Sequence, residues 1–134
     1  ASKREYIDCT GFKVLIVDDN EFNIRVTKKF LERYHFDVEY VLSANDCIYN
    51  IKSEKHYDLI FADYSMPDMD GIELLHSLRA LEGYKIPPVI MLTANAIIGM
   101  KEKYLKEGFN DYISKPINSE ELDKIINKFF KIKK

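Results

Sequence analysis

The chain has 134 residues, a length typical of one domain that buries its own hydrophobic core. Its composition, 46% hydrophobic and 31% charged, is that of an ordinary globular protein, and a net charge of −2 gives no reason to expect a nucleic-acid partner. No apolar run approaches the ~18 residues that a membrane span needs, so this domain is not expected to contact a membrane.

The cysteines and the start of the chain bear on its setting. Cys9 and Cys47 are isolated in the sequence, so they predict neither a disulfide framework nor a metal-binding pair, and a reducing, cytoplasmic setting fits them best. The chain opens on charged residues with no signal peptide and no initiator Met. The missing Met favours a fragment of a longer protein, whose other parts are free to be membrane-anchored.

The first third of the chain predicts a leader, a strand and a helix. Residues 1–12 show no period and are expected to be a leader or the tail of a linker. Residues 13–17 (KVLIV) are apolar and β-branched throughout, as a strand buried on both faces should be. Residues 20–34 follow with a helical pattern. The apolar residues at helical spacing in this segment are Phe22, Val26, Phe30, Leu31 and Tyr34.

The rest of the chain repeats this alternation. Further strands are predicted at 37–42, 57–62, 87–93 and 111–114, and further helices at 44–54, 71–82, 96–107 and from 119 to about 131. Ser43 and Ser119 are the predicted N-caps of two helices, and Gly83 and Gly108 are predicted to end two others.

Strict strand–helix alternation predicts the fold class. It implies parallel strands, right-handed crossovers and helices on both faces of the sheet. The predicted domain spans 13–131, followed by a tail at 132–134, and is a three-layer α/β/α sandwich with a five-stranded parallel sheet and five helices. In such sheets ligands bind at the carboxyl ends of the strands.

Charged and hydroxyl side chains gather at these carboxyl ends. Asp18 and Asp19 follow the first strand, Asp63 the third, Thr93 the fourth and Lys115 the fifth. Any one of these acids alone could be a helix N-cap, but one cap suffices and three carboxylates on one rim repel one another unless a cation lies between them. Oxygen ligands without His or Cys favour Mg²⁺ over a transition metal.

The same residues predict phosphoryl chemistry. An Asp carboxylate can act as a nucleophile and form an aspartyl phosphate, while a metal, the Lys115 ammonium and the Thr93 hydroxyl neutralise the phosphoryl oxygens. The chain has neither a GxxxxGK[ST] loop nor a GxGxxG turn, so the donor is not expected to be held as a nucleotide. The phosphoryl group should arrive on another protein or on a small acyl phosphate.

Four segments resemble the signature segments of response-regulator receiver domains, and the resemblance covers residues 13 to about 131. These segments are KVLIVDDNEFN, FADYSMPDMDG, VIMLTANA and DYISKPI. The resemblance implies the flavodoxin-like strand order 2-1-3-4-5, which is also known for a chemotaxis receiver. It implies that Asp63 is phosphorylated and that Asp18 and Asp19 hold Mg²⁺ with Asp63.

The resemblance implies roles for other residues as well. The backbone carbonyl of Ser65 would be a further metal ligand, Thr93 the switch hydroxyl that moves toward the phosphoryl group, and Lys115 its ionic partner. Pro116 would follow a cis peptide bond. Tyr112 resembles the aromatic switch residue that rotates on phosphorylation, and the alternative is a half-buried strand tyrosine.

Two positions depart from the family pattern or vary within it. His35 stands where the family commonly closes the first helix on a glycine, so it must adopt a left-handed conformation or the helix must end differently. Ser65 and Asn95 occupy positions that tune phosphoryl lifetime in this family, and that lifetime does not follow from the sequence.

The motifs resemble the receivers of hybrid histidine kinases more than those of DNA-binding regulators. The expected partners are a histidine kinase, including the protein's own kinase in cis, or a histidine phosphotransfer domain. The chain contains no kinase itself, since it lacks an ATP-binding glycine-rich box, and His35, His56 and His76 lack the context of a phosphodonor helix and are predicted to be surface residues.

Three alternatives stay open from the sequence. The chain could be a stand-alone single-domain regulator. A haloacid-dehalogenase-like phosphatase also uses an Asp after its first strand but needs a second Asp two residues later, where this chain has Asn20. A degenerate receiver that only binds partners normally lacks one or more of the site residues, and all are present here.

Overall fold

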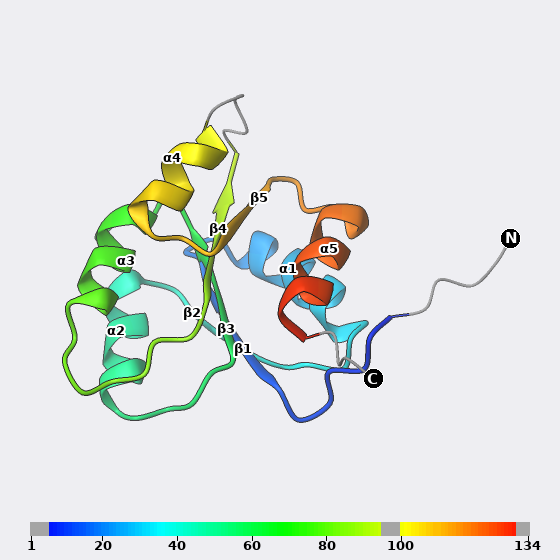
Figure 1. The fold of residues 1–134 in the computed structure, drawn as a ribbon, viewed down its shortest axis with the longest axis horizontal. Coiled ribbons are helices and arrows are strands. Elements are labelled where there is room, and N and C mark those ends of the chain that lie inside the picture. Colours follow the sequence, from blue (N-terminus) through cyan, green and yellow to red (C-terminus); the bar gives the residue numbers. More distant parts are fainter. Residues whose placement is uncertain (1–5, 95–99, 131–134) are drawn as a thin grey trace, which may run out of the picture.

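The computed structural model describes residues 6–94 and 100–130. Strands and helices alternate throughout this part of the chain (Figure 1). The strands are β1 (Lys13–Val17), β2 (Asp37–Val41), β3 (Leu59–Asp63), β4 (Val89–Thr93) and β5 (Asp111–Ser114). The helices are α1 (Glu21–Glu32), α2 (Ala44–Lys52), α3 (Gly71–Arg79), α4 (Met100–Glu107) and α5 (Ser119–Phe130).

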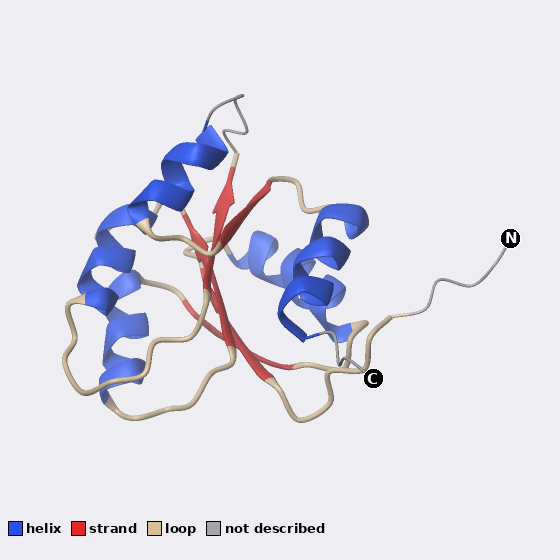
Figure 2. Cartoon of the chain, viewed as in Figure 1, coloured by secondary structure: helices blue, strands red, loops and turns tan. Residues whose placement is uncertain are grey.

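The sheet has the order β2-β1-β3-β4-β5, and every pair of neighbouring strands is parallel. Helices α1 and α5 cover one face of this sheet, and α2, α3 and α4 cover the other (Figures 1 and 2). The predicted three-layer α/β/α sandwich and strand order are therefore confirmed. Every helix in the described part of the chain is too short or too polar to cross a bilayer.

The hydrophobic core has two halves, one on each side of the sheet. One half lies between the sheet and α1 with α5, and the other lies between the sheet and the three remaining helices. Alternate residues of a strand point to opposite faces, so β1 sends Val14 and Ile16 into one half and Leu15 and Val17 into the other. All of β3 and β4 are buried as well, which explains why these strands are continuous apolar runs.

The apolar spacing predicts only part of the buried stripe of helix α1: Leu31, and Tyr34 just beyond the helix, are buried as predicted, but Phe22 is not. The buried residues of the helix are Ile24, Thr27 and Leu31, whereas Phe22 is 66% exposed. Thr27 belongs to the buried stripe, but a count of apolar residues does not include a threonine. Val26, one turn from Phe22, is half-buried.

The ends of the helices confirm some of the predicted caps, among them Ser43 at the start of α2, and correct the one at the start of α5. Gly108 follows α4 with a φ of 110°, and His35 has a φ of 66°, the left-handed conformation that was one of its two options. The N-cap of α5 is Asn118, whose Oδ1 accepts from the Glu121 N–H at 2.9 Å, so the prediction of a Ser119 cap is wrong by one residue. Ser119 is instead the first residue of the helix.

Several helices and strands begin or end at other residues than predicted. Helix α3 ends at Arg79, well before Gly83, because its last turn closes on the Ala80 N–H, which donates to the His76 carbonyl at 3.0 Å. Strand β4 begins after the two prolines at 87 and 88 rather than at 87, since proline offers no N–H to a ladder. Strand β3 extends to Asp63, one residue beyond the prediction. Residues 96–99 of the predicted fourth helix lie outside the described residues.

Residues 6–12 run beside the domain and contribute to its core. Cys9 is fully buried, and its N–H donates to the Tyr34 carbonyl at 2.7 Å. The ring of Tyr6 packs edge-on against Tyr34 with 5.0 Å between centroids, and Phe12 lies at the same distance from Phe130. We therefore propose that the structural domain starts within residues 6–12 and not at the first strand.

Candidate functional site

Three carboxylates converge at the carboxyl ends of β1 and β3. Asp18 and Asp19 follow β1 directly, and Asp63 is the last residue of β3. One carboxylate oxygen from each lies within 4.8 Å of the others. Asp18 is fully buried and Asp63 is 6% exposed, whereas Asp19 is exposed to solvent. The parallel pairing of β1 with β3 brings these acids together although 45 residues separate them.

Lys115 binds two of these acids. Its ammonium Nζ lies 2.6 Å from Asp63 Oδ1 and 3.4 Å from Asp18 Oδ2. The Lys115 backbone N–H donates to the Thr93 carbonyl at 2.8 Å, which fixes the start of the β5–α5 loop against the end of β4. The Lys115–Pro116 peptide bond is cis, as the family resemblance implies.

The pKa of Asp63 is raised above its ordinary value of 3.8. Burial is the largest cause, and the neighbouring negative charge of Asp18 adds to it. Hydrogen bonding and charge from Lys115, and the Ser65 backbone N–H, act in the opposite direction without cancelling the effect of burial. The site therefore holds a carboxylate whose negative charge is under-compensated by this chain's own residues.

The loop between β1 and α1 holds Asp18 from its own backbone. Asp18 Oδ1 accepts from the Asn20 N–H at 2.9 Å, and Asn20 in turn caps α1 by accepting from the Asn23 N–H at 3.0 Å. The residue that a haloacid-dehalogenase-like site would require to be acidic is thus a helix cap here.

The loop after β3 is tightly constrained. The Gly71 N–H donates to the Tyr64 carbonyl at 2.8 Å, and a Cβ at Gly71 would lie 3.1 Å from the backbone oxygen of Asp63, so only glycine fits without displacing the strand end. Asp68 accepts from the Asn45 N–H at 2.8 Å and ties the loop to the start of α2. Asp70 caps α3 in a reciprocal capping box.

Two predicted switch residues lie next to a third residue that sequence reasoning missed. Thr93 is 1% exposed, and its Oγ1 lies 3.3 Å from the hydroxyl oxygen of Tyr104 on α4. The Tyr104 ring is 6.0 Å from the ring of Tyr112, which is half-buried on β5. Tyr104 follows Thr93 by 11 residues in an ordinary helical pattern, so only the packing of α4 on the sheet reveals the contact.

Other predicted residues are placed less completely. Ser65 is exposed, and its N–H donates to Asp63, while the metal role of its carbonyl stays a prediction. Asn95 lies outside the described residues. His35, His56 and His76 are all exposed, as predicted.

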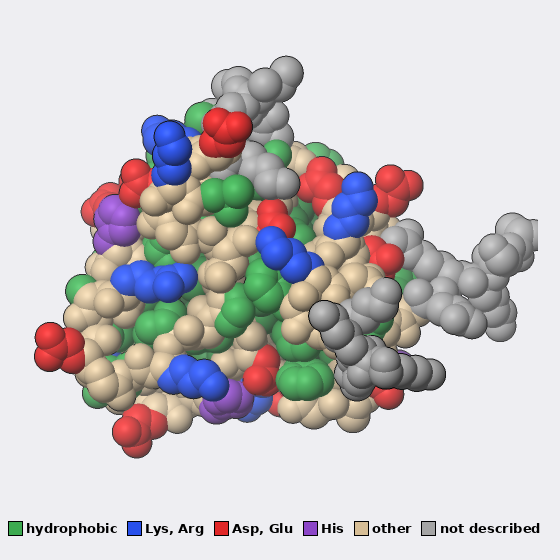
Figure 3. Space-filling view, viewed as in Figure 1, with side chains coloured by type: hydrophobic (Ala, Val, Ile, Leu, Met, Phe, Trp, Pro, Cys, Tyr) green, Lys and Arg blue, Asp and Glu red, His purple; other side chains and the backbone are tan. Residues whose placement is uncertain are grey.

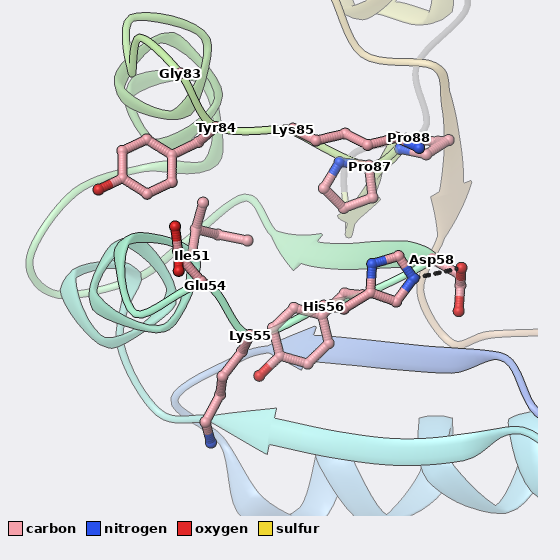
Figure 4. A pocket seen from close by; sticks show the side chains of 11 residues that line it. Ile51, Glu54, Lys55, His56, Asp58, Gly83, Tyr84, Lys85, Pro87 and Pro88 are labelled. Carbon is pink, nitrogen blue, oxygen red and sulfur yellow. Dashed lines mark hydrogen bonds and ion pairs between the residues drawn. The ribbon is translucent and has the colours of Figure 1, made fainter.

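A hollow lies at the opposite end of the sheet from these acids. It has a volume of about 330 Å³ and lies among the end of α2 and the loops that precede β3 and β4 (Figure 4). His56 points across it to Asp58, with 3.0 Å between Nε2 and Oδ1. The hollow contains none of the motif residues, so it is not the candidate site.

The donor set at the carboxyl ends fits a magnesium ion. Mg²⁺ prefers oxygen ligands, takes one or a few carboxylates and keeps several waters. Asp18, Asp19 and Asp63 offer three carboxylates, one of them exposed to water. A divalent cation there would supply the positive charge that Lys115 alone does not provide.

A family model for the response regulator receiver domain matches residues 14–127. The chain therefore belongs to the response-regulator receiver family.

Individual relatives and structures agree with this family. The chain is 40% identical over 125 residues to hybrid signal transduction histidine kinase L of Dictyostelium discoideum, covering 89% of this chain but 7% of that kinase. The receiver domain of sensor histidine kinase PA1611 from Pseudomonas aeruginosa PAO1, solved with magnesium in its active-site cleft, superposes with a TM-score of 0.77 at 32% identity, covering 90% of this chain and 98% of that one.

A third similar structure contains a partner. It is the complex of the Saccharomyces cerevisiae phosphotransfer protein Ypd1 with the receiver domain of Ssk1, with a TM-score of 0.77 and 29% identity over 94% of this chain and 91% of that one. The chain spans only a small part of the curated relatives it matches, 7% and 12% for two of them.

Proposed function

We propose that this receiver domain accepts a phosphoryl group on Asp63, assisted by a magnesium ion held by Asp18, Asp19 and Asp63 with the Ser65 carbonyl. The observation that supports this most directly is the cluster of three carboxylates within 4.8 Å of one another. Lys115 lies 2.6 Å from Asp63 and completes the positive side of the site. The magnesium ion would screen the negative charge of the incoming phosphoryl oxygens.

The transfer step conserves atoms and electrons. A carboxylate oxygen of Asp63 attacks the phosphorus of a phosphohistidine, the new P–O bond forms, and the P–N bond breaks. Its electron pair stays on the histidine ring nitrogen. In the product, the Lys115 ammonium pairs with a phosphoryl oxygen instead of the free carboxylate oxygen. The Thr93 hydroxyl donates to another phosphoryl oxygen.

The proposed donor is a histidine kinase or a histidine phosphotransfer domain. The kinase relatives and the Ypd1 complex support this class of partner. A hollow of about 90 Å³ beside Lys115 is lined by Phe22, Val26, Pro116 and Ile117, among others. Phe22 and Pro116 are exposed there, and exposed apolar side chains beside Lys115 suit a protein donor better than a small, highly charged phosphate ester.

The proposed signal is a population shift. The phosphoryl group draws Thr93 toward Asp63, Tyr112 follows, and the face formed by α4, β5 and α5 changes. We propose that the chain is part of a hybrid histidine kinase, with a stand-alone single-domain regulator as the alternative. Two relatives from Dictyostelium discoideum, which are hybrid signal transduction histidine kinases, support this.

Asp63→Asn tests this function. Wild-type protein with acetyl phosphate and Mg²⁺ should gain the mass of one phosphoryl group, and the variant should not, because the amide is not a nucleophile for this reaction. The matched control Asp46→Asn removes an exposed carboxylate from α2 and should be labelled at the wild-type rate. Excess EDTA should abolish labelling of the wild type.

Each other outcome contradicts the proposal. Labelling of Asp63→Asn at the wild-type rate would exclude Asp63 as the acceptor. Undiminished labelling in EDTA would exclude the metal role. Sustained turnover of a phosphate ester would indicate a phosphatase, and a wild type that never gains mass would indicate a receiver that only binds partners.

A further inference from the structure

Tyr104 contacts both residues that the proposed switch moves. Its hydroxyl oxygen lies 3.3 Å from Thr93 Oγ1, and its ring packs against Tyr112 with 6.0 Å between centroids. The Tyr104 side chain is 1% exposed and is one of the largest fully buried side chains in the described part of the chain. It is held from other sides by Tyr64 and Phe109, whose ring centroids lie 6.4 Å and 6.2 Å away.

The geometry of the Thr93–Tyr104 bond makes it sensitive to movement of Thr93. Hydroxyl–hydroxyl hydrogen bonds are usually 2.5–3.0 Å long and are most common near 2.7–2.8 Å. At 3.3 Å the bond is already longer than this range, so a shift of Thr93 away from Tyr104 breaks it. Because Tyr104 is buried on α4 and held by its aromatic neighbours, its hydroxyl can neither follow Thr93 freely nor turn to bulk water.

We propose that Tyr104 is a positioning residue that holds Thr93 in the unphosphorylated arrangement and thereby opposes the switch. This proposal rests on the proposed function, because it assumes that Thr93 moves toward a phosphoryl group on Asp63. Loss of a hydrogen bond to a buried hydroxyl is the cost that the phosphorylated arrangement must overcome. The fraction of molecules in the phosphorylated arrangement is therefore lower than it would be without the hydrogen bond between Thr93 and Tyr104.

The opposite effect is conceivable from the same contact. Tyr104 could donate to Thr93 while Thr93 donates to a phosphoryl oxygen, and such a chain of hydrogen bonds would favour the phosphorylated arrangement. The long distance and the fixed ring favour the opposing role, and the sign of one measurement separates the two.

The experiment uses Tyr104→Phe, which removes the hydroxyl and keeps the ring. Beryllium trifluoride with Mg²⁺, a stable analogue of an aspartyl phosphate, is titrated into the full chain, and its binding is followed by the NMR signal of the Thr93 methyl group. The variant should bind the analogue about two- to tenfold more tightly, since one neutral hydrogen bond no longer favours the unbound arrangement. Without metal or analogue, its Thr93 signal should already lie partway toward the bound position.

The control is Tyr34→Phe, which removes another buried tyrosine hydroxyl, one that donates to Asp123 at 2.8 Å on the other face of the sheet. Analogue binding by this variant should equal that of the wild type. In a Thr93→Val background, Tyr104→Phe should add no further gain, because the hydrogen bond is already absent.

Several results would overturn the proposal. Unchanged or weaker binding by Tyr104→Phe does so while leaving the proposed function intact, and so does an equal gain in the Thr93→Val background. A wild type that neither binds the analogue nor accepts label from acetyl phosphate overturns both. If Tyr104→Phe does not fold, the Cζ carbon signal of Tyr104 in the wild type decides: it must move when the analogue binds, and a static signal rejects the role.

Discussion

At the scale of single residues, the site combines burial with negative charge. Asp63 and Asp18 are both buried, and Lys115 is the cation that the structure places between them. The pKa of Asp63 is nonetheless raised, because loss of solvent outweighs the contribution of Lys115. Burying this charge destabilises the metal-free protein. Binding of a divalent cation, alone or with a phosphoryl group, would relieve that destabilisation.

This destabilisation predicts that Asp63→Asn stabilises the metal-free protein. A carboxyl group whose folded pKa is raised destabilises the fold above that folded pKa, and the effect vanishes below its ordinary value of 3.8. In EDTA at pH 7 the variant should have a higher free energy of unfolding than the wild type, a gain large enough to measure, because the amide lacks the charge that burial disfavours. The gain should shrink toward zero as the pH falls to 4, measured by urea denaturation.

Glu102→Gln is the matched control for this prediction. It removes one exposed negative charge from α4 and should change the free energy of unfolding by less than ~0.5 kcal/mol. An Asp63→Asn variant that is less stable than the wild type at pH 7, or whose advantage does not vary with pH, would show that burial of Asp63 is not a net cost.

The sequence predicts the acidic residues of the site but not Tyr104, which contacts Thr93. Asp18, Asp63 and Lys115 end separate strands, and a parallel sheet necessarily brings strand ends together, so their convergence was predictable. Tyr104 lies on a helix, and its contact with Thr93 depends on the axial position and rotation of α4 on the sheet. No sequence period carries that information.

At the scale of elements, the errors arose where a polar residue took a structural role. The buried stripe of α1 includes Thr27, so a count of apolar residues shifted the predicted face toward Phe22, which is exposed. At α5, Asn118 and Ser119 are both good N-cap residues in adjacent positions, and propensity alone cannot order them. The hydrogen bond from Glu121 to Asn118 decides the matter.

The correction at α5 predicts a difference between two neighbouring variants. Asn118→Ala removes the acceptor of the Glu121 N–H and should lower the free energy of unfolding by about 1 kcal/mol. Ser119→Ala removes a hydroxyl that accepts from Arg33 at 3.2 Å on the exposed surface, and its effect should be smaller. Chemical denaturation of both variants checks the order, and a larger loss for Ser119→Ala would restore the cap that the sequence suggested.

At the scale of the whole molecule, the candidate site and the segment 6–12 lie toward opposite ends of the sheet. The acids and Lys115 lie at the carboxyl ends of the strands, while the segment 6–12 packs near the ends of α1 and α5 that point away from them. On the face seen in Figure 3, acidic and basic side chains are interspersed rather than gathered by sign.

The lack of a period in residues 6–12 predicts a leader, yet periodicity reports only regular secondary structure. Cys9 is as buried as the core strands, and a chain in extended contact with a core needs no repeat to be buried. Its contribution comes from single side chains and from the hydrogen bond to the Tyr34 carbonyl. A domain boundary drawn at the first strand would therefore cut through the core.

This arrangement predicts that both thiols are protected in the native protein. Burial raises the pKa of Cys9 to about 11 and that of Cys47 to about 12, so at pH 8 very little thiolate is present, and neither sulfur is accessible. An aromatic disulfide reagent should modify both cysteines rapidly in denaturant and neither on the same timescale in native buffer, with Cys9→Ala and Cys47→Ala assigning each thiol. If Cys9 reacts quickly in native protein while Cys47 stays protected, the segment 6–12 is a detachable leader. Equal protection of the two thiols makes that segment part of the same cooperative unit as the sheet, because Cys9 can then react only when the core itself opens.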